Sequence, residues 1–475
     1  MAIRAALAEQ TVKTEGRTAA DIRRLVAESE LRMTSLDSKI AELKLAAAPM
    51  EDDGPEDFKS SSVEGEAPLA SASLLQQRDR ERITAAVLRH LVSPIRSLPV
   101  ELLAEIFLLT IRDKELDFLE KYKHFQDAYR VSHVCSEWQQ IAHCTPQLWT
   151  GTIAVTVKEV GADTVDGLRA WFARSDPLPV PVILRAGRWP GNLETLPPVL
   201  EELLRVAPRW GILHCLDGFL PHMFYQRLAD CTLDSLEAAN LEPLYSDDDI
   251  TSALFLLAIS PRLRKLVLRL DLLDDPGTSV TLPSLRLLML TLRSERNTHL
   301  SPFLNFLSAP ALETLSISFL SDSISWTQAA FTAFLLRSSN ITELCLRWCP
   351  LTSSDLITAL AHAPSLTHLQ LEGCHRLDDA FLLALHHHVD AGTPPLVPFL
   401  HDFHLEDMSE LLTETLIVGM LTSRWRAGSA TARWSRVVLS MQYTMMFFTK
   451  DFRHALRELA REGFPVEIPD ELLEP

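Results

Sequence analysis

One short pattern recurs along the second half of the chain and constrains the fold more than any other feature of the sequence. The pattern is Leu-x-x-Leu-x-Leu, usually just after a proline, and successive clear copies start 22, 27, 29 and 25 residues apart. Alternating apolar residues are typical of a short strand with one buried face. Between the strands, apolar residues recur at helical spacing, as at 254–257, 331–335, 356–360 and 381–385. The copies begin at Leu263, Leu285, Leu312, Ile341 and Leu366.

One strand and one helix in every 22–30 residues is the period of leucine-rich repeats. We therefore expect residues 205–450 to form an uneven α/β horseshoe, with weaker copies near Leu233 and Leu400. Cys349 and Cys374 fall at the turns after their strands, where such repeats place an asparagine or a cysteine to satisfy buried backbone groups. A non-repetitive α/β domain with leucine-rich strands is the alternative.

The N-terminal third of the chain has a different pattern. Apolar residues from Val26 to Leu43 recur in steps of three and four, which fits either a short amphipathic helix over 1–47 or a dimerising coiled coil. Residues 48–71 are rich in acids, serine, proline and glycine, which predicts a disordered linker. Helical spacing returns over 72–92 and should end before Pro94.

Residues 93–150 contain two short apolar segments with helical spacing. In the first, Pro99 suits the first helical position and Glu101 lies near the positive end of the helix dipole. A unit of this size buries little surface and is often completed by a partner, so we expect part of its apolar stripe to stay exposed. The first stripe comprises Leu102, Leu103, Ile106 and Phe107, and the second, read as one helical face, comprises Val131, Val134, Cys135, Trp138, Ile141 and Ala142.

The two segments, taken in order, resemble the F-box. The lead-in "HLVSPIRSLP" is similar to that of a large group of fungal F-box proteins, and the cysteine-containing repeats resemble those often joined to F-boxes. The residues that carry the resemblance are Leu98, Pro99, Glu101, Leu102, Ile106 and Phe107, then Val131, Ser132, Val134, Cys135, Trp138, Ile141, Ala142, Leu148 and Trp149.

The resemblance implies a mixed α/β protein: N-terminal helices and a small all-α F-box, then a linking segment over 151–204, the leucine-rich-repeat horseshoe, and a C-terminal helix and tail over 451–475. It also implies the substrate-recognition subunit of an SCF-type ubiquitin ligase, whose F-box binds the adaptor subunit and, indirectly, the cullin. Adaptor contacts are then expected from Leu98, Pro99, Glu101, Leu102, Ile106, Phe107, Val131, Cys135 and Trp138.

The repeats would hold an unknown target protein for ubiquitination. Strand positions between the inward leucines should face the concave side of the horseshoe. The expected target-binding residues are Arg264, Arg269, Glu313, Ser316, Glu343, Arg347, His368 and Gln370.

Composition excludes several other classes. The net charge of −18 argues against nucleic acid or an anionic membrane as partner, and no apolar run approaches the length of a membrane span. Seven cysteines without a Cys-x-x-Cys pair indicate reduced thiols in a cytoplasmic or nuclear protein. Phosphate-loop and hydrolase motifs are missing, and consecutive histidines at 386–388 point to different helix faces, so we expect no cofactor, metal or catalytic residue. The alternatives are a non-ligase scaffold of the same fold and a hydrolase with a non-standard Cys/His site.

Overall fold

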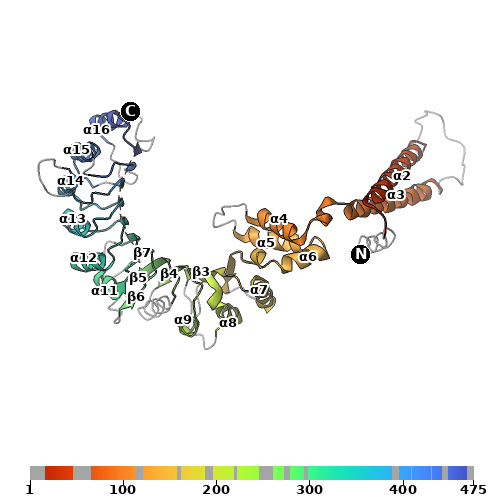
Figure 1. The fold of residues 1–475 in the computed structure, drawn as a ribbon, viewed down its shortest axis with the longest axis horizontal. Coiled ribbons are helices and arrows are strands. Elements are labelled where there is room, and N and C mark those ends of the chain that lie inside the picture. Colours follow the sequence, from red (N-terminus) through yellow and green to blue (C-terminus); the bar gives the residue numbers. More distant parts are fainter. Residues whose placement is uncertain are drawn as a thin grey trace, which may run out of the picture. The chain divides into compact units, whose positions relative to one another are not determined.

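The chain forms two compact units, residues 1–110 and 111–475, which we describe separately. Figure 1 shows the fold in a computed structural model. The structure describes residues 16–46, 66–112, 121–157, 162–187, 196–218, 222–244, 260–271, 279–293, 298–321, 324–387, 395–407, 409–428, 431–440 and 448–467.

In the first unit, two long helices pack against each other: α2 (Ala19–Ala46) and α3 (Glu66–Leu91). Ile22 and Val26 of α2 form a buried cluster with Leu88 of α3. The periodic face of α2 therefore lies against α3, and a second copy would have to displace α3 to use the same face. Helix α3 also begins inside the segment 48–71 that the sequence predicts to be a linker, because its alanine-rich start favours a helix and tolerates proline in the first turn. Residues 48–65 lie outside the described residues.

A 3-10 turn, η1 (Pro94–Ser97), leads into α4 (Val100–Arg112). The carbonyl of Pro99 accepts hydrogen bonds from the backbone N–H groups of Leu102 and Leu103, both at 3.1 Å. Pro99 is therefore the N-cap, one position before the first helical turn where the sequence analysis places it.

The second unit begins with α5 (Lys121–Ser132), α6 (Ser136–His143) and η2 (Pro146–Trp149). The single helical face expected from Val131 to Ala142 is wrong, because the helix breaks before α6. Cys135 adopts an extended backbone, with φ −157° and ψ 171°, and its Sγ accepts from the backbone N–H of Trp138 at 3.5 Å. Cys135 thus caps α6, so α5 and α6 are separate helices and their axes need not be parallel.

A parallel sheet of twelve strands follows, and its strands lie side by side in chain order within the part of the chain that is described. It begins with β1, upstream of the boundary at 205 that the sequence predicts, and ends with β16, beyond the boundary at 450. The strands are β1 (Ile153–Thr156), β2 (Val180–Gly187), β3 (Trp210–Gly218), β4 (Ala238–Leu244), β5 (Lys265–Asp271), β7 (Leu287–Arg293), β10 (Thr314–Phe319), β12 (Glu343–Arg347), β13 (His368–Glu372), β14 (Asp402–Glu406), β15 (Arg436–Ser440) and β16 (Val466–Glu467).

Helices connect the strands and cover one face of the sheet, as Figure 1 shows for α12 to α16. Two short strand pairs, β6 (Val280–Thr281) with β9 (Leu307–Ser308) and β8 (Thr298–His299) with β11 (Ile324–Ser325), lie in the connections. The helix expected at 254–257 falls outside the described residues. The helical elements are α7 (Ala162–Ser175), α8 (Pro198–Arg205), η4 (Ala207–Arg209), α9 (His222–Ala229), α11 (Ser301–Phe306), α12 (Gln328–Arg337), α13 (Ser353–Ala361), α14 (Asp379–Leu385), α15 (Glu414–Trp425) and α16 (Lys450–Arg461).

Register aligns the leucines of successive repeats beneath one another. Leu315 of β10 pairs with Leu344 of β12, which pairs with Leu369 of β13, and all three side chains are buried. At the turns, the thiol of Cys349 donates to the carbonyl of Ile317 at 3.7 Å, and Cys374 bonds that of Leu346 at 3.6 Å. Each cysteine thus reaches the preceding strand. Whether this architecture is a leucine-rich-repeat horseshoe stays a prediction.

Candidate functional site

Helix α4 presents apolar side chains to solvent. Leu102, Ile106 and Leu109 are 52%, 38% and 57% exposed, while Leu103 and Phe107 on the same helix are 1% exposed. The exposed residues follow the spacing i, i+4, i+7, so they form one stripe along the helix. Because an exposed apolar stripe of this kind marks an interaction surface, α4 is the first candidate site.

The residues predicted to contact an adaptor do not all lie at the surface. Pro99, Glu101, Leu102 and Ile106 are exposed, and Leu98 is half-buried. Phe107 is buried, so its predicted adaptor contact stays a prediction that the exposed surface of α4 does not support. Three large apolar residues outside that prediction, Val100, Leu109 and Val134, are exposed as well. The remaining predicted contacts, Val131, Cys135 and Trp138, are half-buried on α5 and α6.

In the second unit, Trp149 joins the short helices to the sheet region. Its side chain is buried, and its indole Nε1 donates to the carbonyl of Ala142 at 2.7 Å. The ring lies 4.9 Å from that of Trp171 on α7, at 79°, and the guanidinium of Arg174 lies 4.6 Å from its centroid. The end of the small helical region and the start of the sheet therefore share one packed core.

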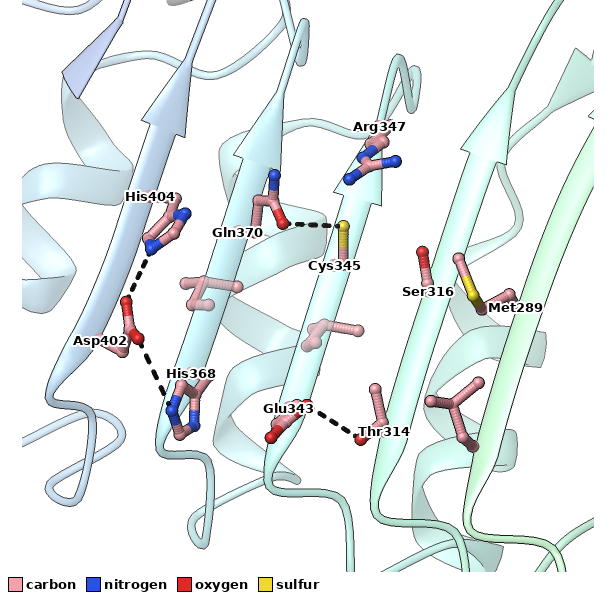
Figure 2. A pocket seen from close by; sticks show the side chains of 13 residues that line it. Met289, Thr314, Ser316, Glu343, Cys345, Arg347, His368, Gln370, Asp402 and His404 are labelled. Carbon is pink, nitrogen blue, oxygen red and sulfur yellow. Dashed lines mark hydrogen bonds and ion pairs between the residues drawn. The ribbon is translucent and has the colours of Figure 1, made fainter. Parts of the chain in front are cut away.

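A second candidate site is a groove of about 290 Å³ on the sheet, lined by residues of β7, β10, β12, β13 and β14. Figure 2 shows its side chains on the face opposite the connecting helices. Parallel register aligns them in two rows across the strands. The first row is Thr314, Glu343, His368 and Asp402, and the second is Ser316, Cys345, Gln370 and His404.

Hydrogen bonds and close contacts join these side chains, most of them between neighbouring strands (Figure 2). Thr314 Oγ1 donates to Glu343 Oε2 at 2.9 Å, and the Cys345 thiol bonds Gln370 Oε1 at 3.5 Å. Asp402 lies between two imidazoles, 3.6 Å from His368 Nε2 and 2.8 Å from His404 Nε2. The groove surface is thus polar and preorganised by contacts between strands.

Carboxylates outnumber cations on this part of the sheet. Arg347 Nε lies 3.0 Å from Glu372 Oε2, next to the groove. Burial raises the pKa of the Glu372 carboxyl; Arg347 opposes this rise, and the negative charges of Glu406 and Asp407 add to it. Arg436 at the neighbouring strand pairs with Glu467 at 2.9 Å. Within the described ranges, Glu343, Asp402 and Glu406 have no ion pair with a lysine or arginine.

Five of the eight predicted target-binding residues line this groove: Ser316, Glu343, Arg347, His368 and Gln370. Arg269 lies on β5, at an outward position of the same sheet face, but it does not line the groove. Arg264 and Glu313 precede β5 and β10, and Glu313 pairs with Arg286 at 3.2 Å. Both are exposed and lie one residue before their strands, so the alternation within a strand does not place them on the sheet face, and their target-binding role stays a prediction.

Comparison with known protein families identifies the region that contains α4. Residues 95–151 match the F-box-like domain family. This chain therefore carries an F-box-like domain. A chain of the crystal structure of the Rad7 and Elc1 complex in yeast is 16% identical, with 72% of this chain and 85% of that chain covered and a TM-score of 0.38. That likeness is too low to carry an argument. None of the curated proteins matches the sequence.

The sequence analysis missed part of each site. In the F-box-like domain, the helical spacing from Leu102 to Ile106 continues to Leu109. The sequence therefore contained the pattern that would have placed Leu109 in the stripe. In the groove, Asp402 and His404 occupy outward positions of a strand that the sequence showed only as a weak repeat copy around Leu400. Applying the same alternation to that copy would have found both.

Among the described residues, no group of three histidine, cysteine or acidic side chains is arranged to hold a metal ion. His386 and His387 are described and His388 is not. Burial raises the pKa of the Cys215 and Cys374 thiols to about 12, which leaves them as thiols at neutral pH. In the same part of the chain, no helix combines the length and the apolar character needed to cross a membrane.

Proposed function

We propose that this chain is the substrate-recognition subunit of an SCF-type ubiquitin ligase. In this proposal the F-box-like domain binds the adaptor subunit, which connects it to the cullin, and the sheet holds a target protein. The observation that carries the proposal is the exposed apolar stripe of α4, which lies inside the segment matching the F-box-like family.

The stripe has the properties expected of a docking surface. Leu102, Ile106 and Leu109 have no polar atoms to satisfy, so covering them releases water at little cost in lost hydrogen bonds. Since each is about half exposed, its burial in a complex contributes on the order of 1 kcal/mol. A partner helix or groove with matching apolar residues would supply the remaining affinity.

The sheet supplies the second half of the proposed function. Its strands and helices repeat along the chain, which we interpret as leucine-rich repeats, and such arrays use an extended sheet face to bind proteins. The proposed contribution of the chain to ubiquitination is proximity: it catalyses nothing and brings target lysines near a ubiquitin-loaded conjugating enzyme. The site of its action would be the cytoplasm or the nucleus.

The test is capture of the recombinant adaptor subunit by the purified full-length chain. We expect L102D combined with I106D to weaken capture at least 100-fold, because two carboxylates would face an apolar partner. The matched control is L336D combined with L383D, two leucines that are 60% and 48% exposed on α12 and α14. This control should capture as wild type does.

Two results would overturn adaptor docking. One is that the wild-type chain captures no adaptor. The other is that the α4 variant captures as much as wild type. Either result would favour the alternative function, a protein-interaction scaffold of the same fold that does not join a ligase.

A further inference from the structure

We infer that the groove across β7 to β14 binds an extended, arginine-bearing segment of the target protein. This inference rests on the proposed function and adds the chemistry of the target to it. It follows from the charge of the groove, from its shape and apolar end at β7, and from its direction across the strands.

The charge argument starts from two carboxylates that line the groove, Glu343 on β12 and Asp402 on β14. Strand β13 separates them, so their backbones lie about 10 Å apart. Their contacts within the described residues are a threonine hydroxyl and two imidazoles rather than a lysine or arginine. Glu372 and Glu406, register partners on the same face, add two more negative charges beside the groove. A cation above β13 is therefore attracted from several directions.

Like charges on neighbouring strands oppose each other, and the fold compensates only part of this repulsion. Arg347 pairs with Glu372, and Gln370 donates to Glu406 Oε1 at 3.1 Å. Other cations on the same face are Arg436 on β15, which is the register partner of Asp402 and pairs with Glu467, and Lys265 and Arg269 on β5, outside the groove. Four carboxylates and one arginine face outward on β12–β14, so this part of the sheet stays acidic and favours a positively charged segment.

The shape of the groove favours arginine over lysine. Leu287 and Met289 on β7 extend the two rows with half-buried apolar side chains. A guanidinium is planar and weakly hydrated, so it can lie against these apolar side chains while its five N–H donors reach nearby carboxylates. An ammonium is a compact, strongly hydrated point charge and loses more hydration in the same place. The volume of about 290 Å³ admits a few side chains and no folded element.

The direction of the groove indicates an extended ligand. It crosses five neighbouring strands of the sheet, a distance of about 19 Å at the usual strand spacing. An extended chain of about six residues covers that length. Alternate side chains of such a segment would face the groove and the solvent.

The experiment measures binding of a fluorescein-labelled octapeptide of alternating arginine and serine to the full-length chain by fluorescence anisotropy. Matched peptides replace arginine with lysine, with the neutral isostere citrulline, or with glutamate. The protein variants are E343Q combined with D402N and, as a control with the same loss of charge, D234N combined with E237Q at exposed positions near β4. Equal melting temperatures will confirm that the variants are folded.

We expect saturable binding of the arginine peptide, at least tenfold weaker binding by E343Q with D402N, and less than a twofold change in the control pair. Lysine should bind more weakly than arginine, and citrulline and glutamate should not bind. The inference is overturned if the wild-type chain does not bind the arginine peptide, if citrulline binds equally, or if both variant pairs lose the same affinity. Adaptor capture is measured separately, so a failure of the groove leaves the proposed function standing, and a failure of capture leaves the peptide result standing.

Discussion

The exposed stripe of α4 and the groove on the sheet are both candidate protein-binding surfaces, yet they differ in almost every physical property. The stripe consists of Leu102, Ile106 and Leu109 and offers no hydrogen-bonding side chain. The groove offers carboxylates, imidazoles and an amide, and contacts such as Cys345–Gln370 and His368–Asp402 join neighbouring strands. The first surface depends on water release, and the second depends on charge and geometry.

This difference teaches how the two partners should be recognised. An apolar stripe tolerates any partner with a complementary apolar surface, which suits one constant adaptor. A charged groove discriminates, because a wrongly charged ligand meets unpaired carboxylates and loses its own hydration. The comparison therefore predicts strong, salt-insensitive binding at α4 and selective, salt-sensitive binding at the groove.

The largest effect is expected within α4 itself, between adjacent leucines. L103D places a carboxylate at a site that is 1% exposed, so it should destabilise the local fold by more than about 3 kcal/mol. L102D changes an exposed site and should cost less than about 0.5 kcal/mol of stability. Hydrogen exchange of the α4 amides measures both: protection should be lost in L103D and retained in L102D. Equal loss in the two variants would mean that the exposed stripe is part of the folded core.

A smaller effect is expected from salt, which should separate the two surfaces. Raising sodium chloride from 50 to 500 mM shortens the range of electrostatic attraction. The arginine octapeptide should therefore bind the groove about tenfold more weakly. Adaptor capture through α4 should change less than about threefold, because burial of apolar surface carries no charge. Isothermal titration at both salt concentrations gives the two ratios. Equal salt dependence would show that one surface has been assigned the wrong kind of partner.

Local periodicity predicted the parts of the structure that depend on one strand or one helix. The buried leucines at Leu315, Leu344 and Leu369 follow the period of two, and they lie in register as the repeat spacing indicates. The same rule placed Ser316 and Gln370 on the open face. The rule does not reach Arg264, which lies one residue before β5 begins.

What the sequence could not predict depends on contacts between distant segments. In α4, the neighbours Leu102 and Leu103 are both apolar, and so are Ile106 and Phe107. The pattern therefore predicts a helix but does not predict which side of it is buried. Strands β1 and β2 lack the leucine pattern and join the sheet only through pairing with strands some thirty residues away. The break before α6 depends on the capping bond of Cys135, which apolar spacing does not reveal.

The smallest expected effect uses a thiol of the groove as a reporter of occupancy. Cys345 is half-buried there, and burial raises the pKa of its thiol against the opposing influence of Arg347. A raised pKa leaves less thiolate at pH 7.5, so Cys345 should react with N-ethylmaleimide more slowly than the exposed Cys144 near the end of α6.

Saturating arginine octapeptide should slow labelling of Cys345 a further two- to fivefold, because the peptide covers its strand, and should leave Cys144 unchanged. Mass spectrometry of the labelled peptides reads both rates in one sample. If the peptide binds saturably and labelling of Cys345 does not slow, the peptide binds elsewhere on this acidic chain. In that case the contrast between an apolar adaptor surface and a charged target groove would no longer hold.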